Sequence, residues 1–171
     1  MTNPVVLLVE DNETFLNAYS QILRSGACGG VHCKVISAID GVDGLEKFTQ
    51  NINDISFVIT DFQMPRLNGG ELAKKIRNLD PTMHIILNSS GFAPPSVAHL
   101  FFASTLKEKE NLISATSMLI QMWQMKSTLS KDCIQISKQA TCDLGSNIKT
   151  SNPKISDKFF SNIRRLFVTN R

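Results

Sequence analysis

The 171-residue sequence predicts an α/β fold, a five-stranded parallel sheet with helices on both faces, followed by a partly helical C-terminal tail. Three observations predict it. Five short apolar segments alternate with segments whose apolar residues recur at helical spacing. The first of them, VVLLV at residues 5–9, is apolar throughout, which is typical of strands buried on both faces in parallel sheets. The composition, 42% hydrophobic and 19% charged, is that of a globular domain.

The expected strands are short, and most of them end at polar residues. The sequence predicts strands at residues 5–9, 34–39, 55–60, 84–88 and 100–107. The third is the clearest, because its β-branched and aromatic residues, Phe57, Val58 and Ile59, favour strands. It ends at Asp61, and a loop with Pro65 and Gly69 follows.

Helical patterns fill the intervals between these strands. The first helix is expected to follow Asn12, a candidate N-cap, and to stop at Gly26. The others are expected around residues 42–48, at 70–78 before the break at Asp80-Pro81, at 96–99, and as a long amphipathic helix at 110–125. No internal repeat is visible.

Chemically active side chains lie at the end of four of the five strands or directly after them. They are Glu10 and Asp11, Asp61, Ser89 and Ser90, and Lys107. The carboxyl ends of parallel strands share one edge of the sheet, where open α/β folds bind ligands. Each carboxylate taken alone is equally consistent with capping a helix or a turn. Together they would repel one another unless a cation such as Mg²⁺ lay among them, and the whole set fits phosphoryl transfer to a carboxylate.

Several short motifs strengthen this interpretation. They are LVEDN at 8–12, AIDG at 38–41, DFQMP at 61–65 with Gly69, Ser90-Gly91, and Lys107. From residue 4 to about 126 the chain resembles the receiver domain of bacterial two-component response regulators. The resemblance implies a flavodoxin-like sheet of receiver type, and a phosphorelay signalling protein rather than an enzyme.

The resemblance also implies a role for each site residue. Asp61 would accept the phosphoryl group from a histidine kinase or a histidine phosphotransfer protein. Lys107 and Ser90 would engage that group, and Mg²⁺ would be bound by Glu10, Asp11, Asp61 and the backbone carbonyl of Gln63, directly or through water. Ser89 is the competing hydroxyl. We favour Ser90 because the family places a small residue next, and Gly91 fits.

The chain departs from the family pattern after the fourth strand. Glu108 follows Lys107 where the family usually has a proline, and Ser104 stands where many members carry an aromatic residue. The fourth helix must also be short. These changes affect the face through which receivers usually signal. A receiver-like interaction module that works without phosphorylation is therefore an alternative.

The C-terminal part differs in charge from the rest. Residues 1–125 contain nine Lys and Arg against twelve Asp and Glu, whereas residues 126–171 contain nine against three. We therefore predict a receiver domain at 1–126 and a basic region at 127–171, comprising a linker and a short amphipathic helix at 155–168, without a recognised output domain. Breaks are expected at 143–146 and 151–153, with a possible helix at 129–141.

The sequence does not identify what the basic region at 127–171 binds. This region could dock on an unknown downstream protein, lie at a membrane surface, contact nucleic acid, or close the protein's own core. A DNA-binding transcriptional regulator is the main alternative, although no helix-turn-helix pattern is present.

Other classes fit the sequence poorly. No apolar run approaches the ~20 residues that cross a bilayer, and the N-terminus lacks the basic start of a secretory signal. Cys28, His32 and Cys33 lie close together but lack the paired spacing of a zinc site, so reduced thiols and a cytoplasmic location are expected. No Ser-His-Asp or Cys-His arrangement points to a hydrolase.

Overall fold

A computed structural model describes residues 3–91 and 93–147, with side chains as far as residue 128. Its sheet contains five parallel strands in the order β2-β1-β3-β4-β5. They are β1 (Val5–Val9), β2 (Lys34–Ala38), β3 (Ile55–Thr60), β4 (Ile85–Ser89) and β5 (Ala103–Leu106). The predicted α/β architecture is therefore confirmed, and β1 and β3 lie next to each other at its centre.

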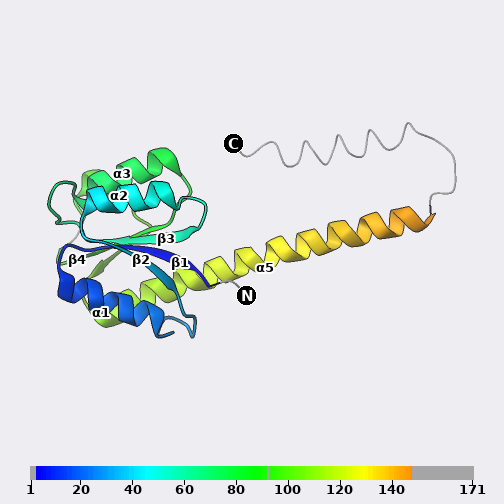
Figure 1. Ribbon diagram of the computed structural model, residues 1–171, viewed down its shortest axis with the longest axis horizontal. Helices are drawn as coiled ribbons and strands as arrows, with labels where there is room; N and C mark the ends of the chain where they lie inside the picture. The colour runs from blue at the N-terminus through cyan, green and yellow to red at the C-terminus, as the bar shows by residue number, and fades with distance from the viewer. Residues whose placement is uncertain (1–2, 92, 148–171) are drawn as a thin grey trace. The chain divides into compact units, whose positions relative to one another are not determined.

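The helices cover both faces of this sheet. They are α1 (Glu13–Arg24), α2 (Gly41–Gln50), α3 (Gly69–Leu79), α4 (Pro95–Ala98) and α5 (Lys109–Asn147). Figure 1 shows α2 and α3 on one face, with α1 and the first turns of α5 on the other. On β1, Val6 and Leu8 pack into the core on the α1 face, whereas Leu7 and Val9 pack into the core on the α2 face. An uninterrupted apolar run is thus what a strand covered on both sides requires.

Polar caps fix the starts of three helices close to the carboxyl edge. Asn12 Oδ1 accepts hydrogen bonds from two amides in the first turn of α1, and Asp40 Oδ1 does the same for α2. Asn68 and Glu71 form a reciprocal capping box at the start of α3. Because each cap lies in the loop after β1, β2 or β3, these three loops are held in place.

The fifth strand is shorter than predicted. It begins at Ala103, whereas residues 100–102 form a turn and an irregular segment. Leu100 is buried in the core beside α3, and its amide donates to the Val97 carbonyl. The apolar character of Leu100 therefore reflects packing after α4, and the first backbone contact with β4 comes only at Phe102, whose amide donates to the Ile85 carbonyl at 2.7 Å.

The last helix is longer than predicted. It runs without interruption from Lys109 to Asn147, through the predicted linker start at 127 and the predicted break at 143–146. The stretch contains no proline and a single glycine near its end, so no residue in it stops a helix sharply. Internal contacts divide the chain into Met1–Ser127 and Thr128–Arg171, and the amphipathic segment at 155–168 lies outside the described residues.

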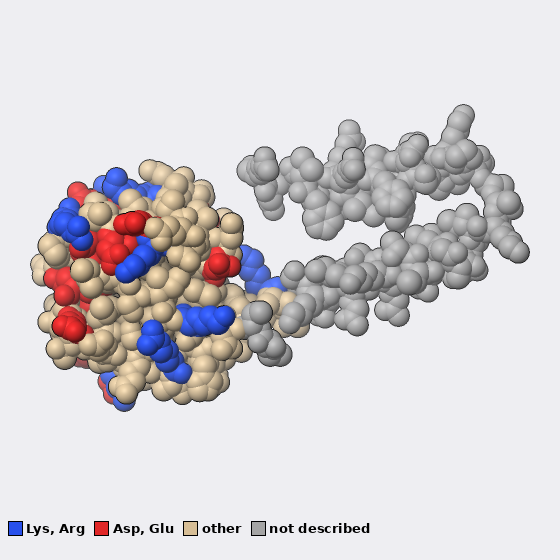
Figure 2. All heavy atoms as spheres, viewed as in Figure 1, with Lys and Arg blue, Asp and Glu red and all other residues tan. Residues whose placement is uncertain are grey.

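The surface charges of the folded domain are mixed. Figure 2 shows acidic and basic side chains close together on the upper left part of the visible face, whereas uncharged residues cover most of the rest. A surface that follows a nucleic acid backbone carries a continuous basic patch. The visible face has no such patch, because basic and acidic side chains are both present on it. None of the described helices combines the length and apolar character needed to span a bilayer.

Candidate functional site

Asp61 lies immediately after β3, at the carboxyl edge of the sheet. Its side chain is buried, with only 5% of the residue exposed. Its backbone amide donates to the Val9 carbonyl at 3.0 Å, which ties it to β1. Its Oδ1 accepts the Phe62 amide at 2.6 Å, and its Oδ2 accepts Lys107 Nζ at 2.8 Å. The carboxylate is therefore oriented by hydrogen bonds before any ligand arrives.

Two more carboxylates come from the end of β1. Oxygens of Glu10, Asp11 and Asp61 all lie within 4.8 Å of one another. The neighbouring positions of β1 and β3, with Val9 paired to Thr60, produce this cluster. Glu10 is buried and Asp11 is exposed, so the cluster has one closed and one open side. Burial raises the pKa of Glu10, although its contact with Lys107 acts in the opposite direction.

Lys107 bridges the cluster from the edge of the sheet. Its Nζ lies 2.8 Å from Glu10 Oε1 and 2.8 Å from Asp61 Oδ2, and its side chain is only 12% exposed. Burial by itself would lower the pKa of Lys107, but hydrogen bonds to Asp61 and Glu10 outweigh it and raise the pKa. Because β4 lies between β3 and β5, this side chain reaches past a strand to balance the charge of the buried carboxylates.

The two candidate hydroxyls differ in their surroundings. Ser89 is the last residue of β4, is 3% exposed, and pairs in register with Leu106, directly before Lys107. Ser90 follows the strand and is exposed. Among the described contacts, neither hydroxyl hydrogen-bonds to Asp61 or Lys107. The structure thus brings four of the predicted site residues together, namely Glu10, Asp11, Asp61 and Lys107. It does not decide between the hydroxyls of Ser89 and Ser90.

The loop after Asp61 is held by a contact that the sequence did not indicate. Arg66 adopts a left-handed backbone conformation, with φ 66°, and pairs with the buried carboxylate of Asp40. Burial opposes ionisation of Asp40, but Arg66 and the amides at the start of α2 lower its pKa overall. This ion pair attaches the loop that contains Gln63 to the loop after β2. Gln63 itself is exposed.

Gly69 closes the same loop at a point where no side chain fits. A Cβ at Gly69 would lie 2.1 Å from the Asp61 carbonyl oxygen, a backbone atom that cannot move away easily. We expect Gly69→Ala to lower the free energy of unfolding by about 3 kcal/mol, the upper end of ordinary overpacking. Denaturant unfolding of the full chain measures this.

Gly91→Ala is the matched control, because a Cβ there meets nothing within 4 Å. Equal stability of the two variants would show that the Gly69 contact is not as tight as described.

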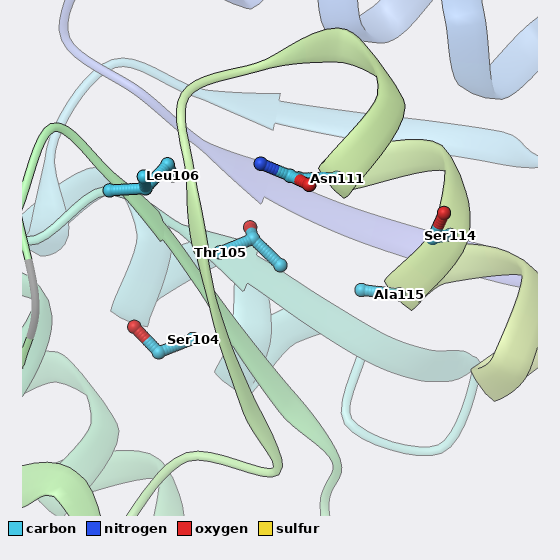
Figure 3. Close-up of a pocket in the computed structure, with 6 residues that line it drawn as sticks. All are labelled: Ser104, Thr105, Leu106, Asn111, Ser114 and Ala115. Carbon is cyan, nitrogen blue, oxygen red and sulfur yellow. The ribbon is translucent and has the colours of Figure 1, made fainter.

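A separate hollow lies beside β5. It has a volume of about 350 Å³ and is lined by residues of β5 and α5, namely Ser104, Thr105, Leu106, Asn111, Ser114 and Ala115 (Figure 3). Thr105 Oγ1 donates to the buried Asn88 Oδ1 at 3.0 Å. The hollow shares no lining residue with the acidic cluster, so it is distinct from the candidate site.

The predicted thiol loop carries no metal-binding arrangement. Cys28 and Cys33 are free and belong to the hydrophobic core, where burial raises the pKa of Cys33 to about 11. His32 Nδ1 instead contacts the Arg24 carbonyl. Within the described part of the chain, Glu10, Asp11 and Asp61 are the only group of three candidate metal ligands.

A parallel five-stranded sheet with this acidic edge defines a receiver-type protein. The family model for the response regulator receiver domain matches residues 6–103, and the chain belongs to that family. Receiver domains are signalling phosphoacceptors rather than ordinary enzymes, bind Mg²⁺ at the acidic pocket, and interact with histidine kinases or phosphotransfer proteins.

Individual relatives agree with this assignment. Protein PilG of Pseudomonas aeruginosa is 36% identical over 73 residues, which are 43% of this chain and 49% of PilG. Hybrid signal transduction histidine kinase D of Dictyostelium discoideum is 33% identical over 75 residues, 44% of this chain but 4% of the kinase. A receiver domain protein of Clostridium thermocellum has a TM-score of 0.59 and 26% identity, covering 71% of this chain and 98% of that one. The chain spans half or less of these two curated relatives.

Proposed function

We propose that this protein is a phosphorelay receiver in which Asp61 accepts a phosphoryl group from the phosphohistidine of a histidine kinase or phosphotransfer protein. The phosphorylated state then switches a surface that binds a downstream protein. One observation supports this most strongly. An ammonium group lies 2.8 Å from both Asp61 and Glu10, inside a cluster of three carboxylates at the carboxyl edge.

The donor set of the cluster suits Mg²⁺. Three carboxylates within 4.8 Å supply the hard oxygen ligands that this ion prefers, and the exposed Asp11 leaves room for waters. Glu10, Asp11, Asp61 and the Gln63 carbonyl would hold the ion. When bound, Mg²⁺ would neutralise charge on the oxygens of the transferring phosphoryl group.

The side chains of the chain itself do the rest of the chemistry. A carboxylate oxygen of Asp61 attacks phosphorus, the bond from phosphorus to the donor nitrogen breaks, and the histidine leaves with the electron pair of that bond. The Phe62 amide keeps Asp61 oriented through Oδ1. Lys107, which contacts Asp61 Oδ2 beforehand, is placed to contact an oxygen of the incoming group.

Incubation of the full chain with acetyl phosphate, followed by intact mass measurement, tests the proposal. We expect one phosphoryl group per chain with Mg²⁺ present and none with a chelator. The adduct should be labile to hydroxylamine, as an acyl phosphate is. A hydroxylamine-stable adduct would mean that the phosphoryl group is not on a carboxylate, and equal uptake with chelator would show that the reaction does not require Mg²⁺; either result would contradict the proposal.

The hydroxyl that follows the phosphoryl group can be identified by a pair of substitutions. The sequence favoured Ser90, but burial at the end of β4 makes Ser89 the better-fixed donor. We therefore expect Ser89→Ala to bind beryllofluoride with Mg²⁺ yet to lose most of the amide shift changes in β5 and α5. Ser90→Ala should keep them. NMR spectra of both variants decide, and the opposite outcome would restore Ser90.

A further inference from the structure

We propose that Phe15 is a positioning residue that holds the Lys107 ammonium at the acceptor carboxylate. This inference rests on the proposed function, because it assigns a role in the same site. Phe15 belongs to the first turn of α1, two residues after the start of that helix at Glu13.

The first observation is the position of the ring. Lys107 Nζ lies over the Phe15 ring, 4.9 Å from its centroid. The same nitrogen lies 2.8 Å from Glu10 and 2.8 Å from Asp61. The negative face of an aromatic ring attracts a cation at this distance. The ammonium therefore has a carboxylate on two sides and a ring on a third.

The second observation is that the ring is itself held. Phe15 stacks on Tyr19, with centroids 5.7 Å apart and an interplanar angle of 19°. Tyr19 is buried in the core on the α1 face. The Phe15 amide donates to Asn12 Oδ1, so the helix cap fixes the backbone below the ring. A ring that is held in place restricts the position of the Lys107 ammonium more than a mobile side chain would.

The third observation is exposure. Phe15 is 38% exposed, although an apolar ring of this size gains free energy from burial. The Phe15 ring lies at the edge of the acidic cluster and covers one side of Lys107. The carboxylates of Glu10 and Asp61 contact the same ammonium group. A lysine side chain has four rotatable bonds, and the ring limits how far the ammonium can withdraw when a phosphoryl group enters. Phe15 acts through Lys107 and does not itself contact Asp61 in the described contacts.

The experiment uses the full chain and three variants. Phe15→Leu keeps an apolar side chain but removes the ring, and Phe15→Trp restores an aromatic face. Phe102→Leu is the matched control, because Phe102 is similarly exposed but contacts His84 instead. The probes are acetyl phosphate with Mg²⁺, followed by intact mass against time, and the NMR shift of the Lys107 ε-methylene protons without donor.

We expect Phe15→Leu to slow phosphorylation roughly two- to fivefold, the factor that a partly exposed cation–π contact supplies. It should also abolish the upfield ring-current shift of the Lys107 ε protons. Phe15→Trp should restore both, and Phe102→Leu should change neither.

Wild-type rate and shift in Phe15→Leu would overturn the positioning role. A slower rate with an unchanged Lys107 shift would overturn it as well, because the defect would then be merely structural. Failure of the proposed function looks different: wild type itself would take up no phosphoryl group, while the Lys107 shift would still report the ring contact.

Discussion

Asp61→Asn is expected to take up no phosphoryl group from acetyl phosphate and Mg²⁺ in an intact mass measurement. The substitution replaces an anionic nucleophile by an amide of the same size. The Asn oxygen can still accept the Phe62 amide, which Asp61 Oδ1 accepts at 2.6 Å, so the loop should keep its shape. Loss of phosphoryl uptake would then result from the absence of the nucleophile and not from unfolding of the domain.

Asp54→Asn is the control for this experiment. Asp54 precedes β3, at the amino end of the strand that Asp61 follows, and is exposed. Its substitution should leave uptake at the wild-type level. If Asp61→Asn were labelled as fast as wild type, a different carboxylate would be the acceptor and the proposal would be wrong.

Lys107→Ala is expected to slow phosphorylation by about 100-fold, the lower range for removing one preorganised donor at a site of developing charge. The ammonium contacts Glu10 and Asp61 at 2.8 Å, so its loss removes the neutralising partner of two buried carboxylates. Mg²⁺ binding should persist, because its ligands remain and a competing cation has gone. An NMR titration with Mg²⁺ and a time course of intact mass measure the two quantities separately.

Lys109→Ala is the control, since Lys109 is exposed at the start of α5, two residues from Lys107. Its phosphorylation rate should match that of wild type. A 100-fold loss in this variant, with normal rates for Lys107→Ala, would mean that the end of β5 presents the wrong lysine to the site.

The sheet and its acidic edge could be predicted because their signals are local. A run such as VVLLV at 5–9 specifies a buried strand, and a polar residue marks the end of the run. The strands ending at Glu10 and Asp61 needed only the rules of parallel sheets to bring these side chains together. Lys107 followed from the same reasoning, although it reaches the cluster past β4.

The features that were missed depend on contacts distant in sequence. Nothing local in the sequence links Arg66 to Asp40, or Phe15 to Lys107, because each pair is brought together by the fold. The start of β5 was misplaced because an apolar run does not distinguish packing, as at Leu100, from strand pairing. The length of α5 was underestimated because polar residues and Gly145 were taken as breaks, although a polar residue costs a helix only about 0.5 kcal/mol and a glycine about 1 kcal/mol.

A single residue, Glu108, separates Lys107 from the first residue of α5. The Glu108 amide donates to the Leu106 carbonyl at 2.7 Å, and its carbonyl accepts the Leu112 amide at 3.1 Å, so both of its ends are already engaged. A displacement of the Lys107 backbone must therefore be absorbed by the two dihedral angles of Glu108 or passed to the first turn of α5. The covalent chain thus links the candidate site to α5 through one residue, and this link does not pass through the short helix α4.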